Sequence, residues 1–289
     1  MLRLAVATAE ETLERLRDPL AERGIEASHV QSRGRTIPLD RSPYEQFDVG
    51  FVYPPRIVEG DVVDAHLDVP WVNGRDAVLR SRNKANVLLR LGQADVPVPE
   101  TTLVSHQADE TDLAAAFESF EAPVVVKPTS ATRGVGIAKA HDYDSFLGLV
   151  DYLDLVHDYR ATGDKSFLVQ EFVPDARDVR VMVVDGEYAG AVERERAEDC
   201  GPSDGGWKQN VHRGATAVRI DLDPEHRALA ERVAETLDIA YLGVDLLITG
   251  DRTLVSETAA RPTIDDVSKY EDGFWDRMAA LIEHTAAAG

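Results

Sequence analysis

Two acidic residues in the last fifth of the chain have the chemistry of metal ligands. Asp245 lies in the apolar segment VDLLI, and Glu257 follows the apolar segment TLVS. A carboxylate is costly to bury unless a cation or a metal ion pairs with it, and its hard oxygen atoms suit Mg²⁺. The two side chains share one side of a hairpin if residues 250–252 form a three-residue turn or if a strand is bulged. The pair therefore indicates a metal site, and carboxylates paired with arginines remain the alternative.

A loop of small residues could bind phosphate. Residues 127–136 read KPTSATRGVG, so a strand-like segment delivers Lys127 to a loop that ends with Gly134 and Gly136. Glycine lets backbone N–H groups approach phosphate oxygens, and a lysine ammonium adds a point charge. The loop lacks the G-K-[ST] ending of a Walker A motif. A phosphate-binding loop and an ordinary flexible hairpin loop both fit these residues.

Lysine is rare in this chain, since only six of its 31 basic residues are lysines. Lys84 lies in the helix-like segment SRNKANVLL, and Lys127 ends a strand. Arginine cannot replace lysine as a compact donor. The two lysines together therefore indicate a functional pair, although a surface position stays open for each one alone.

A second basic cluster lies in the segment WKQNVHRGA, residues 207–215. It brings Lys208, Asn210, His212 and Arg213 together in an otherwise acidic chain. Such a cluster could clamp an anion, and a solvated loop is the alternative. For His212 alone the solvated loop is preferred.

The elements that must position these residues follow from the hydrophobic pattern. The first 75–80 residues predict a small α/β layer without a GxGxxG motif after its first strand, which argues against a dinucleotide fold. The pattern then predicts a hairpin turned at Asp185-Gly186. The other expected elements are strands at 2–8, 47–53, 69–74 and 167–173, and helices at 75–91, 109–119, 142–158, 224–237 and 273–285.

The composition excludes several classes of function. The net charge of −21 argues against nucleic acid and anionic membranes as partners. Many carboxylates with few lysines are typical of halophilic archaea, whose salt screens such charges, and a merely acidic protein is the alternative. The apolar runs are far shorter than the ~20 residues of a membrane span, the first residues do not resemble a signal peptide, and a single Cys200 allows no intrachain disulfide. We expect a cytoplasmic protein.

The order of the motifs resembles the ATP-grasp superfamily. The motifs are VVVKP, RGVGI, LVQEFV, DVRVMVV, NVHRGA, GVDLL and SETAARP. Within the superfamily, the chain is similar to the branch that contains the RimK-like ribosomal-protein glutamate ligases, the amino-group-carrier ligases of lysine biosynthesis and the coenzyme-F420 glutamate ligases. The similarity runs from about residue 75 to residue 270, and NVHRGA with GVDLL is its most specific part.

The resemblance implies a domain organisation. The expected fold class is α/β, with an ATP-grasp fold in which two α+β subdomains clasp ATP. A small Rossmann-like pre-ATP-grasp domain would occupy residues 1–78 and the ATP-grasp domain residues 79–289. Within the latter, a nucleotide-clasping lid would span about 95–168, and a metal- and substrate-binding part about 169–289.

The resemblance also implies roles for individual residues. Arg213 and Lys127 would stabilise the transferring phosphoryl group, and Asp245 and Glu257 would bind Mg²⁺ or Mn²⁺. The backbone of Glu171 would meet the adenine edge together with that of Phe172. The residues expected to contact ATP are Lys84, Lys127, Ser130, Arg133, Gly134, Gly136, Gln170, Glu171, Phe172, Val173, Asp178, Lys208, Gln209 and Asn210. Asp178 among them would lie near the ribose.

One residue departs from the family pattern. The family has an asparagine two residues after the metal-binding glutamate, and this chain has Ala259 there. An alanine offers no amide oxygen, so one metal ligand is missing. This departure motivates a second hypothesis, a regulatory ATP-binding protein with weakened catalysis.

The activity that the resemblance implies is ADP-forming ligation of a carboxylate to an amine. The carboxylate would attack the γ-phosphoryl group of ATP to give an acylphosphate, and an amine such as that of glutamate would then form an amide. Arg194 and Arg196 are candidates for the substrate carboxylate, with ion pairs to neighbouring glutamates as the alternative. A kinase-like phosphotransferase is a third hypothesis. The acceptor is not identified by the sequence, and a homo-oligomer is expected only by analogy.

Overall fold

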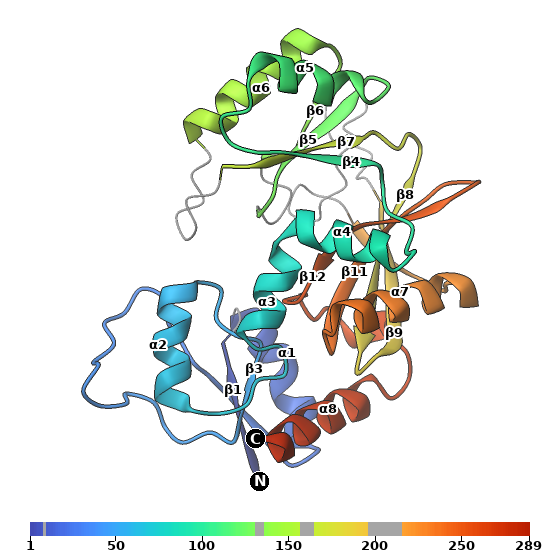
Figure 1. Cartoon of the computed structure of the whole chain (residues 1–289). Helices are drawn as coiled ribbons and strands as arrows, with labels where there is room; N and C mark the ends of the chain where they lie inside the picture. The colour runs from blue at the N-terminus through green and yellow to red at the C-terminus, as the bar shows by residue number, and fades with distance from the viewer. Residues whose placement is uncertain (8–9, 131–135, 157–164, 196–215) are drawn as a thin grey trace.

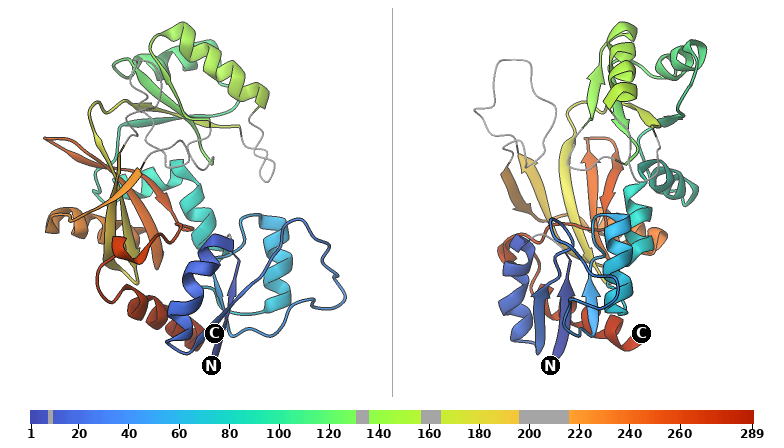
Figure 2. Two further views of the ribbon diagram at one scale, coloured as in Figure 1. Left: turned by 180° about the vertical axis from the view of Figure 1, so that it is seen from behind. Right: turned by 90° about the vertical axis from the view of Figure 1, so that its left-hand side faces the viewer.

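The computed structural model of the 289-residue chain describes residues 1–7, 10–130, 136–156, 165–195 and 216–289. These residues form three β-sheets with helices packed around them, which confirms the expected α/β class (Figure 1). The views in Figure 2 agree that a four-stranded sheet lies at one end of the molecule and the amino-terminal sheet at the other, with a five-stranded sheet between them. None of the helices in the described ranges could cross a membrane.

The amino-terminal sheet is parallel, with the strand order β2-β1-β3. Its strands are β1 (Leu2–Val6), β2 (Ile25–His29) and β3 (Val49–Phe51), and its helices are α1 (Glu10–Ala21) and α2 (Ile57–Leu67). Leu4 and Leu16 of α1 belong to one core cluster, whereas Ala5 and Val63 of α2 belong to another. Since successive strand residues face opposite sides, the two helices cover opposite faces of the sheet.

The strand predicted at 69–74 is wrong. Only Trp71 pairs with the sheet, through an isolated parallel bridge to Gly50. The indole ring lies so close to this glycine that an added Cβ would be 2.3 Å from it. The bridge is followed by Asn73, whose side-chain amide donates to the carbonyl oxygens of Tyr241 and Ala260 at 2.5 and 2.7 Å. These bonds join the amino-terminal sheet to the five-stranded sheet.

The four-stranded sheet is antiparallel, with the order β4-β7-β5-β6. Its strands are β4 (Thr101–Val104), β5 (Val124–Pro128), β6 (Ala138–Ala140) and β7 (Phe167–Glu171), and its helices are α5 (Glu110–Glu118) and α6 (Tyr143–Val156). Side chains such as Val126, Phe146 and Val169 form a core of their own. This sheet is therefore stabilised separately from the rest of the chain.

The five-stranded sheet is also antiparallel, with the order β10-β9-β8-β11-β12. Its elements are β8 (Arg177–Val184), β9 (Glu187–Glu195), β10 (Thr216–Ile220), α7 (Pro224–Leu237), β11 (Tyr241–Ile248), β12 (Thr253–Ala259), η2 (Val267–Lys269) and α8 (Phe274–Ala288). The β8–β9 hairpin turns at Asp185 and Gly186, which have φ angles of 53° and 77°. The predicted turn is thereby confirmed, because positive φ at both positions is typical of a tight hairpin.

One continuous core joins this sheet to the amino-terminal sheet. The cluster contains Phe51 of β3 and Tyr241 of β11, whose ring centroids are 5.2 Å apart. Val181 and Val244 face the same core and are fully buried, and α7 packs against β8, β9 and β11. One face of the five-stranded sheet is therefore apolar and covered.

The helix predicted at 75–91 is two helices, because the chain breaks at Asn83. These are α3 (Arg75–Arg82) and α4 (Lys84–Gln93). The Asn83 side chain accepts a hydrogen bond from the backbone N–H of Asn86 at 3.0 Å, which is an N-cap. The break places Lys84 at the first residue of α4, and that helix continues past Gly92 to Gln93.

Replacing Asn83 with alanine should remove this cap. We expect the free energy of unfolding to fall by about 1 kcal/mol, since one helix donor loses its partner. Urea unfolding followed by circular dichroism measures the change. Asn83→Ser, which can still cap, is the matched control and should lose much less. Equal stability of Asn83→Ala and the wild type would contradict a capping role.

Candidate active site

Five charged side chains share one face of the five-stranded sheet, opposite its apolar face. This charged face consists of Asp178, Arg180, Arg194, Asp245 and Glu257. Asp245 on β11 lies directly opposite Glu257 on β12 and directly opposite Arg180 on β8. Asp178 is two residues from Arg180 and therefore points to the same side, as does Arg194, which bonds to both aspartates.

A bulge in the β11–β12 hairpin brings the two acidic residues opposite each other. The pairing shifts between Asp245 and Leu246, so that Asp245 pairs with Glu257 but Leu246 pairs with Val255. Ser256 is the extra residue, and its hydroxyl donates to the carbonyl oxygen of Asp245 at 3.2 Å. The strands are joined by four residues, 249–252. The predicted shared face is confirmed, and its cause is the bulge, not a three-residue turn.

Asp245 is buried and held by two guanidinium groups. Arg180 donates to both of its carboxylate oxygens, at 2.6 and 2.7 Å, and Arg194 donates at 2.8 Å. Burial by itself would raise the pKa of Asp245, but the two arginines outweigh it and hold the pKa below its usual value. The alternative from the sequence, a carboxylate paired with arginines, is what the structure shows for Asp245.

Asp178 shares one of these arginines. Arg194 donates to its two oxygens at 2.9 and 3.1 Å. Burial and the neighbouring Asp245 charge raise the pKa of Asp178 to about 6, although Arg194 opposes the shift. Arg194 therefore bridges two carboxylates, and its predicted role toward a substrate carboxylate stays a prediction.

Lys84 contacts the charged face from α4. Its ammonium pairs with Oε1 of Glu257. Its backbone N–H donates at 3.0 Å to the carbonyl oxygen of Thr129, just after β5. Only 6% of the Lys84 side chain is exposed, against 28% for Glu257. The carboxylate is therefore the more accessible member of the pair.

Lys127 reaches the same place from the four-stranded sheet. Its ammonium donates at 2.7 Å to Oε1 of Gln170 on β7, and the Gln170 amide donates at 2.7 Å to the hydroxyl of Thr101 on β4. That hydroxyl donates to the carbonyl oxygen of Pro99 at 2.8 Å. This chain of hydrogen bonds fixes the position of a lysine that is itself buried.

The charges around Lys127 show which residues lie together. Burial and the positive charge of Lys84 lower the pKa of Lys127 to about 8, while Glu257 and Asp245 act in the opposite direction. The two predicted lysines and the two predicted metal ligands therefore lie within electrostatic reach of one another. They come from α4, β5, β11 and β12. Figure 1 shows α4 between the four-stranded sheet, which contains β5, and the strands β11 and β12.

The start of the predicted phosphate loop has features of a binding site. The hydroxyl oxygen of Ser130 is buried and makes no hydrogen bond within the described residues. Gly136, at the other end, has a φ of 76°, and an added Cβ would lie 2.8 Å from Pro128. Glycine is therefore required at this position.

The residues predicted near adenine lie at the end of β7. The backbone N–H of Glu171 donates to the carbonyl oxygen of Glu100 at 3.0 Å, and its carboxylate pairs with Arg252. The Phe172 ring has the Lys139 ammonium 4.4 Å from its centroid, and Val173 is buried. The N–H of Glu171 is thus already used within the protein. The other predicted site residues lie outside the described residues; they are Arg133, Gly134, Arg196, Lys208, Gln209, Asn210 and Arg213.

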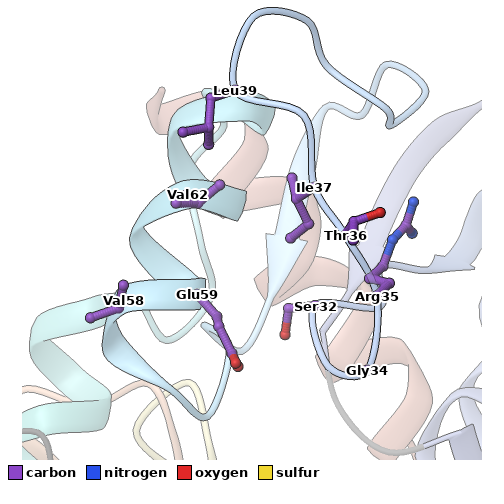
Figure 3. A pocket seen from close by; sticks show the side chains of 9 residues that line it. All are labelled: Ser32, Gly34, Arg35, Thr36, Ile37, Leu39, Val58, Glu59 and Val62. Carbon is purple, nitrogen blue, oxygen red and sulfur yellow. The ribbon is translucent and has the colours of Figure 1, made fainter.

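A hollow in the described part of the chain lies elsewhere, in the amino-terminal unit. It has a volume of about 580 Å³ and includes none of the predicted site residues. Figure 3 shows apolar side chains of α2 and of the preceding loop around it, with Arg35 and Glu59 at its side. Its lining residues are Ser32, Gly34, Arg35, Thr36, Ile37, Leu39, Val58, Glu59 and Val62.

The charge of the candidate site is opposite to that of the whole chain. Three carboxylates (Asp178, Asp245 and Glu257) meet four cationic groups, the guanidinium groups of Arg180 and Arg194 and the ammonium groups of Lys84 and Lys127. The chain as a whole carries −21. A small positive excess in a buried place attracts a polyanion such as a triphosphate.

A comparison with known protein families matches residues 81–278 to the RimK-like ATP-grasp domain. The chain belongs to the RimK-like ATP-grasp family. The matched region contains all seven charged groups described above, which come from α4 and from the two antiparallel sheets. The family resemblance inferred from the motifs is therefore confirmed.

Individual relatives agree with this assignment. A protein of Legionella pneumophila (strain Corby) named "Probable alpha-L-glutamate ligase" is 30% identical over 215 residues, which are 73% of this chain and 66% of that protein, just under two thirds of its length. The RimK domain ATP-grasp protein of Sphaerobacter thermophilus is 25% identical over 99% of this chain and 98% of that one, with a TM-score of 0.68. D-cycloserine synthetase DcsG, at 18% identity, has the same fold over 98% of this chain and 99% of its own, with a TM-score of 0.75.

The donor set fits a metal ion that arrives together with phosphates. The described residues contain no group of three or more His, Cys, Asp or Glu side chains that could hold a metal ion. Asp245 and Glu257 nevertheless lie opposite each other on the charged face. Mg²⁺ commonly takes one or two carboxylates and completes its shell with substrate phosphates and water. Ala259, two residues from Glu257 on the same face, adds no oxygen ligand from its side chain.

Arg180 was not predicted from the sequence. The alternation in DVRVMVV places it on the same face as Asp178, so the pattern contained a signal for it. The cross-strand pairing of β8 with β11, which brings it opposite Asp245, could not be read from that pattern.

The lowered pKa of Lys127 predicts a pH dependence of ATP binding. Phosphate prefers the ammonium form, so ATP affinity should stay level with respect to this group below pH 8 and fall above it, by up to about tenfold per pH unit. Calorimetric titration between pH 6.5 and 9.5 measures how ATP affinity changes with pH. The Lys127→Arg side chain stays charged over this range, so the decline in affinity should disappear. The same decline in both proteins would contradict the assignment to Lys127.

Proposed function

We propose that this protein is an ADP-forming ligase that joins a carboxylate to the amine of an amino acid such as glutamate. The observation that carries the proposal is the meeting of Lys84, Lys127, Asp245 and Glu257 between two sheets. The names of the relatives, glutamate ligase above all, support the reaction class. The separate core of the four-stranded sheet supports a lid at about 95–168 between residues 1–78 and a metal- and substrate-binding part at about 169–289, with the lid extended to the end of β7 at Glu171.

The lysines would hold the phosphates of ATP. Each is buried and tied by a hydrogen bond to a defined partner, Glu257 for Lys84 and Gln170 for Lys127. Phosphoryl transfer needs positioning and neutralisation of charge more than it needs a protein nucleophile. Lys127 would share this charge with Arg213. No serine or cysteine nucleophile is needed for such chemistry.

Asp245 and Glu257 would hold Mg²⁺ or Mn²⁺, and a bound ion would neutralise phosphate charge. In the structure the same carboxylates are paired with Arg180, Arg194 and Lys84. These pairs offset the cost of removing the acids from water.

A binding protein without catalysis is less well supported. The reason to consider it is Ala259, which stands where the family has an asparagine. Ala259 lies on the face of β12 that carries Glu257, opposite Gly243. The relatives named ligase favour turnover instead. This hypothesis predicts that the protein binds ATP and forms no amide.

Isotope transfer tests the proposed reaction. The protein is mixed with ATP, Mg²⁺, glutamate and a set of ¹⁸O-labelled carboxylic acids and peptides in high salt. We expect ADP, a product heavier by one amino-acid residue, and one ¹⁸O atom in the released phosphate, because the carboxylate oxygen attacks phosphorus. Mass spectrometry measures all three.

Variants separate this activity from its alternatives. Lys127→Met should lower the rate by about 100-fold or more, whereas Lys269→Met, which removes a lysine paired with Asp265, should not. Ala259→Asn should raise the affinity for Mg²⁺ in the presence of ATP. A phosphorylated product without an amide would instead identify a kinase, and ATP binding with no product would identify a regulatory protein.

A further inference from the structure

Arg261 crosses from the five-stranded sheet to the amino-terminal sheet. It follows β12, and its guanidinium group donates hydrogen bonds to three backbone carbonyl oxygens, those of Ala7 at 3.2 Å, Val52 at 3.4 Å and Tyr53. The first acceptor comes directly after β1, and the other two come directly after β3. The side chain therefore lies at the carboxyl ends of these two parallel strands.

This position is the switch point of the amino-terminal sheet. The strand order β2-β1-β3 means that the chain leaves β1 toward one side and later returns to its other side. In open parallel sheets, ligands bind in the crevice outside the carboxyl ends of the strands where the order reverses. Here the order reverses between β1 and β3, and the Arg261 guanidinium group lies at the carboxyl ends of these two strands.

Arg261 is a half-buried cation without an anionic partner among the described residues. No carboxylate within the described residues forms an ion pair with it, although the chain has 52 acidic residues. Its Nε–H makes no hydrogen bond in that part of the chain either. Burial, together with the smaller effect of the positive charge of Arg82, lowers its pKa to about 10. An anion bound here would remove this electrostatic cost.

The backbone beside Arg261 is strained. Val52, whose carbonyl oxygen accepts from Arg261, has a φ of 57° and is fully buried. A β-branched residue in the left-handed region is an outlier. Such strain persists only where the surrounding structure imposes it, and it is common at ligand sites.

The segments that carry Arg82 and Arg261 are joined next to residues of the proposed nucleotide site. Arg82 ends α3, two residues before Lys84, and donates to the carbonyl oxygen of Pro55 at 2.9 Å. The hydroxyl of Ser81 accepts from the backbone N–H of Ala260 at 2.9 Å and lies 3.2 Å from the hydroxyl of Thr258. These bonds fasten the end of α3 to the end of β12. Both arginines are therefore close in sequence to groups proposed to hold ATP and its metal ion, Arg82 to Lys84 and Arg261 to Glu257.

We propose that Arg261, with Arg82 beside it, binds the carboxylate of the incoming amine substrate. The substrate class is then an α-amino acid whose α-carboxylate pairs with the Nε and Nη2 edge of Arg261. That edge offers two parallel donors, which match a carboxylate. The inference rests on the proposed ligase function, because it names the substrate that supplies the amine.

The test is binding of amino acids and of their uncharged counterparts. Glutamate and each other common α-amino acid are compared with the corresponding α-carboxamide by calorimetry, on the whole protein with Mg²⁺ and a non-hydrolysable ATP analogue. We expect the wild type to bind at least one amino acid about 10- to 100-fold more tightly than its amide. Arg261→Gln should lose this preference and leave the affinity for the ATP analogue unchanged.

A matched control separates binding from a structural role. Arg80 on α3 also donates to backbone carbonyls, those of Leu237 and Asp238, and Arg80→Gln should keep the preference for the carboxylate. If Arg261→Gln does not fold, Arg261→Lys and Arg82→Gln provide the test, and each should reduce the preference.

Two outcomes would overturn the proposal. One is a wild type that shows no preference for any carboxylate, and the other is an Arg261 variant that weakens both ligands equally and keeps the preference. The binding measurement needs no amide formation. A preference without any ligation product would therefore contradict the ligase and not this site.

Discussion

Mutual neutralisation of buried charges is the constraint on which this structure depends. Asp245 is buried and would be costly without Arg180 and Arg194. Glu257 is paired with Lys84 in the same way. Together with Lys127, these groups form a site that is slightly cationic inside a strongly acidic chain. A triphosphate with its metal ion can enter such a site by exchanging partners, because each acid and base already faces the same space.

Three separate parts of the fold position these groups. The bulge at Ser256 turns Glu257 toward Asp245, the cap at Asn83 starts α4 at Lys84, and the Gln170–Thr101 chain fixes Lys127. The four-stranded sheet that carries Lys127 has its own core, whereas the amino-terminal sheet shares the core of the five-stranded sheet. The acids and Arg261 thus belong to the unit formed by the five-stranded and amino-terminal sheets, whereas Lys127 belongs to the four-stranded sheet.

Much of the site could be predicted, because a charged residue in an apolar segment is costly to bury and therefore indicates a functional role. Asp245, Glu257, Lys84 and Lys127 stood out as charged residues in apolar or lysine-poor surroundings, and the structure brings them together. The sequence could not decide between a strand bulge and a three-residue turn, since both place Asp245 and Glu257 on the same side of the hairpin. The role of Arg261 could not be predicted either, because it depends on how the amino-terminal sheet packs against the end of β12. The halophilic source and the roles of Asp178 and Arg194 stay predictions.

A crystal structure with Mg²⁺ and a non-hydrolysable ATP analogue would show whether the two lysines and the two acids bind the nucleotide together. We expect Lys84 and Lys127 both within about 3 Å of phosphate oxygens, with the metal ion between these phosphates and the carboxylates of Asp245 and Glu257. A triphosphate bound away from both lysines, with the Lys84–Glu257 and Lys127–Gln170 contacts unchanged, would contradict this expectation.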